Sequence, residues 1–180
     1  MGLTNLFALI CHQQPERSWQ LAGETMALCQ RCTGVHLGAL LATLMLFIAR
    51  CPVSPRWIAV HFILALQAAV FGLHLLPETP AIRTLSGQLF SIGIVYLLTA
   101  GLRASRQWGM QSSVRSYLLG SIVSIALVQL AVHSNLPSLL PLLNSAALLG
   151  LLLLIALCLA ALIGLFVPPR ADGSSETQNV

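Results

Sequence analysis

The stretch CHQQPERSWQLAGETMALCQRCTGVHLG, residues 11–38, joins a cysteine- and histidine-rich segment to the small-residue start of a hydrophobic helix. It contains three of the five cysteines, two of the five histidines and two of the five acidic residues of the chain. The remainder of the chain is mostly apolar. We therefore expect the chemistry of this protein to reside in this stretch, with a few polar residues at the ends of later helices contributing.

Composition indicates the class of protein. Of the 180 residues, 57% are hydrophobic and 8% are charged, whereas a soluble domain has about 25% charged residues. Several stretches reach the ~20 apolar residues that span a bilayer. The sequence therefore predicts an all-α integral membrane protein with about five transmembrane helices, in contact with the lipid bilayer. The formal charge of +4 comes from arginines at helix ends, which indicate topology and not nucleic-acid binding.

Prolines and arginines between the apolar runs divide the chain into three regions. Residues 1–33 are expected to form a Cys/His-rich module at the membrane interface. Residues 34–167 are expected to form a transmembrane helical bundle, and residues 168–180 a disordered polar tail. The expected spans cover residues 34–49, 57–76, 82–102, 116–132 and 139–167.

The module is expected to consist of two short helices and a loop. Residues 3–13 suit a short helix lying at the interface, too short to cross. Pro15 suits the first turn of a second helix that ends at Gly23, because its missing N–H would have no partner there anyway. Residues 24–33 are expected to form the loop that carries the cysteine pair.

Small and polar residues within the spans predict contacts between helices. Gly34, Gly38 and Ala42 recur every fourth residue, the spacing that lets two membrane helices approach closely. Gln129 and Asn144, in later spans, are expected to form interhelical hydrogen bonds.

Arginine counts predict the orientation in the membrane. Six arginines lie in the segments after the first, third and fifth spans, and three lie on the other side. The positive-inside rule assigns the arginine-rich side to the cytoplasm. We therefore expect a multi-pass protein of the inner (plasma) membrane whose N-terminal module lies outside the cytoplasm.

The donor atoms of the module suit a transition metal. Cys11, His12, Cys29 and Cys32 offer three thiolates and one imidazole, a set that suits tetrahedral zinc, with copper(I) as the softer alternative. Because adjacent Cys11 and His12 can bind together only if the chain bends, His36 is a substitute ligand. We favour zinc, in either a structural or a catalytic site.

Thiol–disulfide chemistry is the alternative interpretation. Cys29 and Cys32 precede the first span, where the helix dipole favours a thiolate, and Arg31 acts in the same direction. Cys11 would be the resolving thiol of a membrane oxidoreductase that transfers electrons to a quinone. An inert disulfide among these three cysteines is the simplest variant, in an oxidising compartment.

Charged residues and histidines near the module indicate an anionic ligand. Arg17 and Arg83 either anchor helix ends at the headgroups or bind a phosphate or carboxylate of a small molecule or lipid headgroup. Glu16 would then act as a base or orient a neighbouring ligand of the site, so Glu16 and Arg17 are candidate catalytic residues. His74 and His133 are expected on the same face as the cysteines and extend the candidate binding site. These residues are compatible with an enzyme and with a metal-binding protein.

Residues 11–18 (CHQQPERS) and 29–34 (CQRCTG) resemble the signature of an uncharacterised bacterial and archaeal membrane-protein family. That signature is Cys-His-Gln-x-Pro-Glu-Arg-Ser, then Cys-x-Arg-Cys-x-Gly and a hydrophobic helix. A later Asn-x-x-Arg-x-x-x-Gly element is matched by Arg83 and Gly87, with Pro80 in place of asparagine. The resemblance covers about the first half of the chain. It implies a small polytopic membrane protein and supplies no activity.

Overall fold

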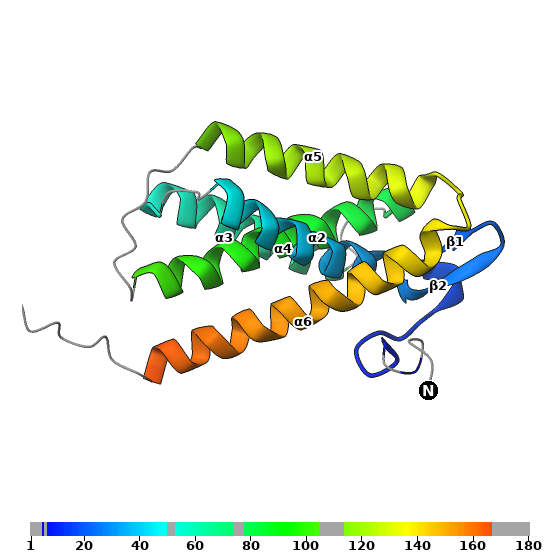
Figure 1. Ribbon diagram of the computed structural model, residues 1–180, viewed down its shortest axis with the longest axis horizontal. Helices are drawn as coiled ribbons and strands as arrows, with labels where there is room; N and C mark the ends of the chain where they lie inside the picture. Colours follow the sequence, from blue (N-terminus) through cyan, green and yellow to red (C-terminus); the bar gives the residue numbers. More distant parts are fainter. Residues whose placement is uncertain (1–4, 6, 50–52, 74–77, 105–113, 167–180) are drawn as a thin grey trace, which may run out of the picture.

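The computed structural model describes residues 5, 7–49, 53–73, 78–104 and 114–166. Within these residues, a short N-terminal module leads into five long helices (Figure 1). The elements in chain order are the 3-10 helix η1 (Pro15–Arg17), strands β1 (Ser18–Leu21) and β2 (Glu24–Cys29), and helices α2 (Gln30–Ala49), α3 (Pro55–Gly72), α4 (Pro80–Ala104), α5 (Val114–His133) and α6 (Leu139–Phe166).

The five long helices confirm the predicted class of a multi-pass helical membrane protein. Each contains an apolar stretch of at least 18 residues, long enough to cross a membrane. Helix α2 begins at Gln30, before the expected start at residue 34, because β2 ends at Cys29 and continues directly into the helix. The end of the second expected span (74–76) and the polar tail (168–180) lie outside the described residues.

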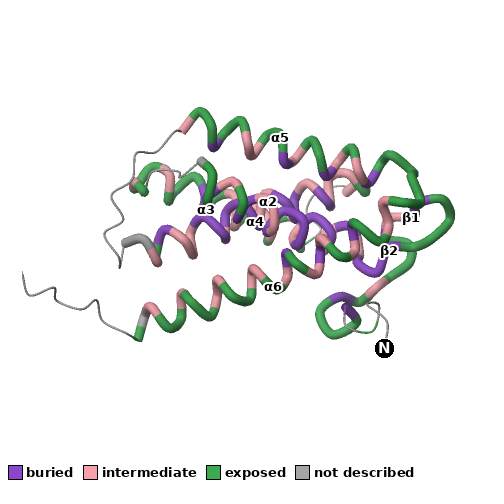
Figure 2. Tube along the Cα trace, in the orientation of Figure 1, coloured by how far each residue is buried: buried purple, intermediate pink, exposed green. Residues whose placement is uncertain are grey.

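Burial distinguishes central helices from peripheral ones. Half of the apolar window of α2 and of α4 is buried inside the protein, against 6% for α3 and 11% for α6. Figure 2 shows the buried positions along α2 and α4 and long exposed stretches on α3, α5 and α6. Many of the exposed side chains are large and apolar, as lipid contact requires. Helices α2 and α4 therefore form the centre of the bundle.

Glycines allow α2 and α4 to pack closely. A Cβ atom on Gly34 would overlap the carbonyl oxygen of Thr84, and one on Gly87 would overlap that of Arg31. A Cβ atom on Gly38 would also crowd the backbone of α4. The close approach predicted from the four-residue spacing of Gly34 and Gly38 is confirmed, and α4 is the helix that approaches.

Amide side chains connect other helices inside the bundle. Gln129 of α5 donates hydrogen bonds to the side-chain oxygen of Gln88 at 3.2 Å and to the carbonyl oxygen of Ala81 at 3.3 Å. This confirms its predicted interhelical role. The side-chain oxygen of Asn144 is buried without a partner among the described residues, so the same prediction is wrong for that atom.

The N-terminal module contains a β-hairpin, so the second helix predicted over residues 15–23 and the loop predicted over 24–33 are wrong. Between residues 15 and 29 only η1 is helical, β1 and β2 then pair antiparallel, and residues 30–33 belong to α2. Ala22 and Gly23 join the strands with φ values of +52° and +88°, the backbone region that a two-residue type I′ hairpin turn requires. Gly23 is therefore a turn residue and not a helix end.

The helix predicted over residues 3–13 ends earlier than expected. The backbone N–H groups of Ile10 and Cys11 both donate to the carbonyl oxygen of Phe7, at 3.1 and 2.9 Å, and close a turn. Residues 11–14 have no regular structure, and Gln13 has a φ of +47°. The Gln13 side chain donates to the carbonyl oxygen of Ala27 at 3.0 Å, which fixes this bend against β2.

The hairpin lies on one end of the bundle, beside the turn between α5 and α6 (Figure 1). The indole N–H of Trp19 donates to the hydroxyl of Thr84 at 2.9 Å, and the backbone N–H of Ala22 donates to the side-chain oxygen of Asn135 at 2.7 Å. Buried apolar side chains join the hairpin to α5 and α6: Leu21, Leu28, Val132 and Leu143. This docking holds β2 where it continues into α2.

Candidate metal centre

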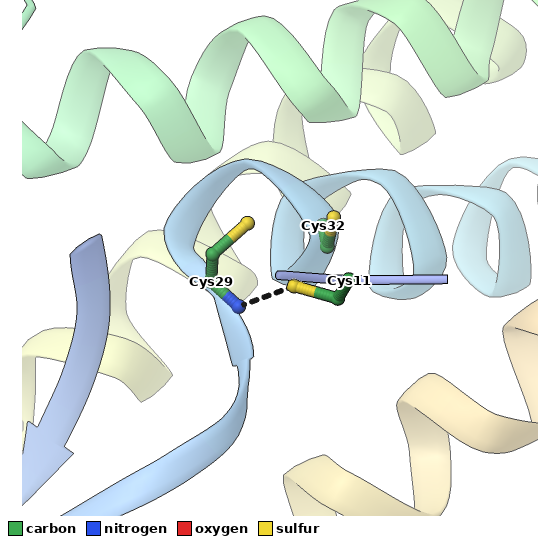
Figure 3. Close-up of side chains that lie close together, drawn as sticks. All are labelled: Cys11, Cys29 and Cys32. Atoms are coloured by element: carbon green, nitrogen blue, oxygen red, sulfur yellow. Dashed lines mark hydrogen bonds between the residues drawn. The ribbon is translucent and has the colours of Figure 1, made fainter. Parts of the chain in front are cut away.

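Three cysteines from two separate segments come together at the hairpin end of the bundle (Figure 3). Cys11 precedes η1, Cys29 is the last residue of β2, and Cys32 lies in the first turn of α2. Their sulfur atoms all lie within 4.8 Å of one another, and all three are free thiols. In a tetrahedral zinc–thiolate site the sulfurs are ~3.8 Å apart, because each Zn–S bond is ~2.3 Å. The group therefore has donors and spacing that suit a metal.

The local fold explains why these sulfurs meet. Strand β2 continues into α2 without a loop, so Cys29 and Cys32 lie three residues apart at a helix start and face the same side. The backbone N–H of Cys29 donates to the sulfur of Cys11 at 3.3 Å and holds the distant cysteine in place (Figure 3). Cys11 is buried and the other two are half-buried. The cluster is thus largely shielded from water.

The surroundings of Cys29 favour its thiolate. The hydrogen bond from the Cys32 side chain contributes most to stabilising the thiolate. The backbone N–H groups of Cys32 and Arg31 and the Cys11 side chain also stabilise it, whereas partial burial disfavours the charged form. Together they lower the pKa of Cys29 to about 5. The two N–H groups belong to the start of α2 and have no partner within the helix. A stabilised thiolate is both a metal ligand and a nucleophile.

A buried carboxylate fixes the two residues that separate the paired cysteines. Glu78, whose side chain is 3% exposed, accepts hydrogen bonds from Arg31 at 2.6 Å and from Arg83 at 3.0 Å. Arg83 also donates to the side-chain oxygen of Gln30 at 3.3 Å. Gln30 and Arg31 are the central residues of the C-x-x-C motif, so its conformation is tied to the start of α4. We call Glu78, Arg31, Arg83 and Gln30 the Glu78 clamp.

Three residues predicted for the site lie at the surface of the module. His12 is exposed next to Cys11 and does not belong to the group of mutually close donor atoms. Glu16 and Arg17 lie in η1 and are both exposed. The roles of His12 as fourth ligand and of Glu16 and Arg17 in catalysis stay predictions.

The predicted ligand-binding residues on later helices occupy different settings. Two nitrogens of Arg83, Nε and Nη1, donate to Glu78 and Gln30. His133 is exposed at the end of α5, at the hairpin end of the bundle as expected, and packs edge-on against the Trp19 ring with a centroid distance of 4.7 Å. His74 lies outside the described residues. Their binding of an anionic ligand stays a prediction.

The substitute ligand His36 lies one turn after Cys32 in α2. It is 7% exposed, and its Nδ1 atom has no hydrogen-bond partner among the described residues. It is not part of the group of donor atoms within 4.8 Å of one another. The described residues therefore bring together three cysteines and no histidine.

Two features of the bundle were not predicted from the sequence. The pair between Arg31 and Glu78 links residues 47 positions apart, and no local pattern indicates such a contact. His61 lies inside α3 and is fully buried. An ionisable residue within an apolar span is itself a signal of function, and that signal could have identified His61.

Comparison with known proteins finds a family whose model is similar to part of the chain. Residues 11–97 match the model of a family described as "Predicted membrane protein (DUF2085)", which confirms the resemblance to uncharacterised membrane proteins. A 40-residue stretch is 42% identical to Uncharacterized protein MJ1492 of Methanocaldococcus jannaschii, over 22% of this chain and 26% of that protein. A 64-residue stretch is 40% identical to an uncharacterized protein of Methanothermobacter thermautotrophicus, over 36% of this chain and 54% of that protein. The chain thus matches about a quarter and about half of these relatives' length. No solved structure matches.

Proposed function

Since residues 11–97 match the model of the DUF2085 family of predicted membrane proteins, and the matched relatives are uncharacterised, we propose a function from the site itself. The protein binds a transition metal, zinc in preference to copper, through Cys11, Cys29 and Cys32 at one end of a membrane-embedded bundle. The observation that carries this proposal is the mutual distance of the three sulfur atoms, all within 4.8 Å. Three thiolates from two chain segments suit a metal better than a single disulfide, which would leave one thiol unused.

Charge favours the divalent ion. Three thiolates around Zn²⁺ carry a net charge of −1, and around Cu⁺ they carry −2. The nearby Glu78 clamp contains two guanidinium groups and one carboxylate, a net charge of +1. A zinc–thiolate centre beside the clamp is therefore electrically balanced, and its burial at the membrane is less costly.

The fourth position decides between a structural and a catalytic role. Structural zinc sites have four protein ligands, whereas catalytic sites keep one position for water or substrate. We propose His12 as the fourth ligand of a structural site, since it directly follows Cys11 and its imidazole would complete a Cys₃His donor set. In a catalytic site the metal would activate water as a Lewis acid, Glu16 would act as a base, and Arg17, Arg83 or His133 would hold an anionic substrate.

The orientation proposed from the arginine distribution puts this centre outside the cytoplasm, at the inner membrane. Residues 1–33 would then be an outward-facing module, residues 34–167 the membrane bundle, and residues 168–180 a cytoplasmic tail.

Metal analysis of the full-length protein, purified in detergent without chelator, tests the proposal. Elemental mass spectrometry should find about one zinc per chain in the wild type. The zinc should be absent from C11S, C29S and C32S. C158S is the matched control, because Cys158 lies in α6 away from the cluster, and it should keep its zinc. Loss of zinc in H12A would support a structural site with four protein ligands. Retention of zinc in H12A would support a site with one position open to water or substrate. Wild-type protein that is folded and metal-free would contradict metal binding.

The second candidate is a membrane thiol–disulfide oxidoreductase, favoured by the low pKa of Cys29 beside the Cys32 thiol. Formation of a disulfide from the Cys29 and Cys32 thiols would release two electrons and two protons, and these would reduce a quinone to a quinol. Alkylation of quenched cells should then trap both thiol and disulfide forms, and a quinone should shift the ratio toward disulfide. Cysteines that stay in one state under all conditions would rule this candidate out.

A further inference from the structure

A second polar cluster lies inside the bundle near the end opposite the hairpin. His61 of α3, Tyr96 of α4 and Tyr117 of α5 are 1%, 1% and 2% exposed. The ring centroid of His61 lies 3.8 Å from that of Tyr96 and 5.7 Å from that of Tyr117. The chain contains two tyrosines in all, and both are in this cluster. Polar side chains inside a membrane bundle are costly and mark functional sites.

Hydrogen bonds determine which nitrogen of His61 carries the proton. The Nδ1 atom lies 2.7 Å from the backbone carbonyl oxygen of Trp57, which can only accept, so Nδ1 carries hydrogen and donates. A positive charge in this apolar interior is costly, so the ring is neutral and Nε2 bears a lone pair. The hydroxyl of Tyr117, 2.7 Å from Nε2, therefore donates to it.

Aromatic rings complete the surroundings of this pair. Tyr96 stacks on the His61 ring with an interplanar angle of 16°, which fixes the imidazole plane. Trp57 is half-buried, and its ring centroid lies 6.4 Å from that of Tyr117. A buried phenol thus has a fixed proton acceptor at hydrogen-bond distance and the half-buried ring of Trp57 nearby.

This arrangement matches what oxidation of a phenol requires. A tyrosine that loses an electron becomes a strong acid, and in an apolar interior its proton needs an acceptor already at hydrogen-bond distance. We propose that Tyr117 is a one-electron donor to membrane-soluble peroxyl radicals, and that its phenolic proton passes to Nε2 of His61. The proposal concerns residues separate from the cysteine cluster and does not depend on metal binding.

The step balances in atoms and charge. One electron passes from Tyr117, past the neighbouring Trp57 ring, to the peroxyl radical, which becomes a peroxide anion. The anion then takes up a proton at the membrane surface and forms a hydroperoxide. The O–H bond of Tyr117 breaks and an N–H bond forms at Nε2 of His61. The products in the protein are a neutral tyrosyl radical and an imidazolium cation, stacked on the electron-rich face of Tyr96.

Electron paramagnetic resonance of the full-length protein in lipid vesicles tests the proposal. A lipid-soluble azo initiator generates peroxyl radicals in the bilayer, and samples are frozen at intervals. We expect a tyrosyl radical in the wild type and in Y96F, and none in Y117F. Because there are two tyrosines, a radical that persists in Y117F would assign the donor to Tyr96 and overturn the proposal. Wild-type protein without a tyrosyl radical would overturn it as well.

The role of His61 has its own test. In H61Q the amide oxygen can still accept the Tyr117 hydrogen bond but cannot hold the proton, so radical formation should slow on the order of 10²-fold. An unchanged rate would show that His61 is not the acceptor. If H61Q does not fold, the wild type still decides: in D2O the radical should form more slowly and its spectrum should lose the coupling to an exchangeable proton. Absence of both effects would contradict proton transfer to His61.

Discussion

The Glu78 carboxylate accepts a hydrogen bond from the Arg31 guanidinium at 2.6 Å, across 47 positions of the chain. The same nitrogen of Arg31 also donates to the carbonyl oxygen of Phe71 at 3.0 Å. Arg31 lies between the paired cysteines, so these bonds connect the C-x-x-C motif both to the end of α3 and to Glu78, two residues before α4. The shape of the candidate metal centre therefore depends on helices that contribute no ligand to it.

We expect Glu78→Gln to destabilise the protein by about 3 kcal/mol, because it leaves two partly buried guanidinium groups without their counter-charge. It should also speed release of the metal to a chelator, since Gln30 and Arg31 would no longer be held. Thermal unfolding and chelator kinetics measure the two effects. Glu24→Gln, an exposed change in the hairpin, is the control. Unchanged metal release in Glu78→Gln would limit the clamp to a structural role.

Gly87→Ala should disrupt the contact between α2 and α4, because the new Cβ atom would overlap the carbonyl oxygen of Arg31. Gly101→Ala in the same helix is the matched control: its Cβ atom meets nothing within 4 Å, and it should be neutral or stabilising by up to about 1 kcal/mol. Unfolding in detergent compares them. Equal behaviour of the two variants would contradict the close packing at Gly87.

The hydrogen bond from Trp19 to Thr84 should contribute about 1 kcal/mol to docking of the hairpin. A double-mutant cycle of Trp19→Phe and Thr84→Val isolates this term from the packing that each substitution also changes. The measured quantity is the coupling free energy of unfolding. A coupling of zero would mean that the apolar core holds the hairpin by itself.

Alkylation of Cys29 in the reduced, metal-free protein should be half-maximal near pH 5 and slow as the pH falls below that value, because only the thiolate reacts. Cys32→Ala removes the hydrogen bond that contributes most to this low pKa, so the midpoint should move upward. Peptide mass spectrometry of iodoacetamide-treated samples follows Cys29 alone. Cys158→Ala is the control and should leave the midpoint in place. A midpoint near 9 in the wild type would contradict the thiolate assignment.

An impermeant maleimide should label Cys29 and Cys32 in intact cells once metal is stripped and thiols are reduced. Cys51, on the side that the arginine distribution assigns to the cytoplasm and outside the described residues, should react only after the cells are permeabilised. Single-cysteine variants separate the signals. The reverse pattern would place the cysteine cluster in the cytoplasm.

The long apolar runs sufficed to predict the five helices, because a membrane-spanning segment satisfies its backbone within itself and its length follows from bilayer thickness. The donor types in residues 11–38 likewise sufficed to predict a cysteine centre. The module was misassigned where local preference and tertiary contact differ. Pro15 does begin a helical turn, but Gly23 closes a hairpin that packs against the ends of α5 and α6, and a two-stranded hairpin by itself is marginally stable.

By itself the sequence therefore determined the class of protein, the number of spans and the residues most suited to chemistry, since these depend on composition and local spacing. The tertiary structure alone decided that Cys11 reaches Cys29 and Cys32, that Glu78 holds Arg31, and that Tyr117 donates to His61. The physical reason is that each of these contacts joins segments whose proximity depends on packing of the whole bundle, and no periodicity along the chain encodes it.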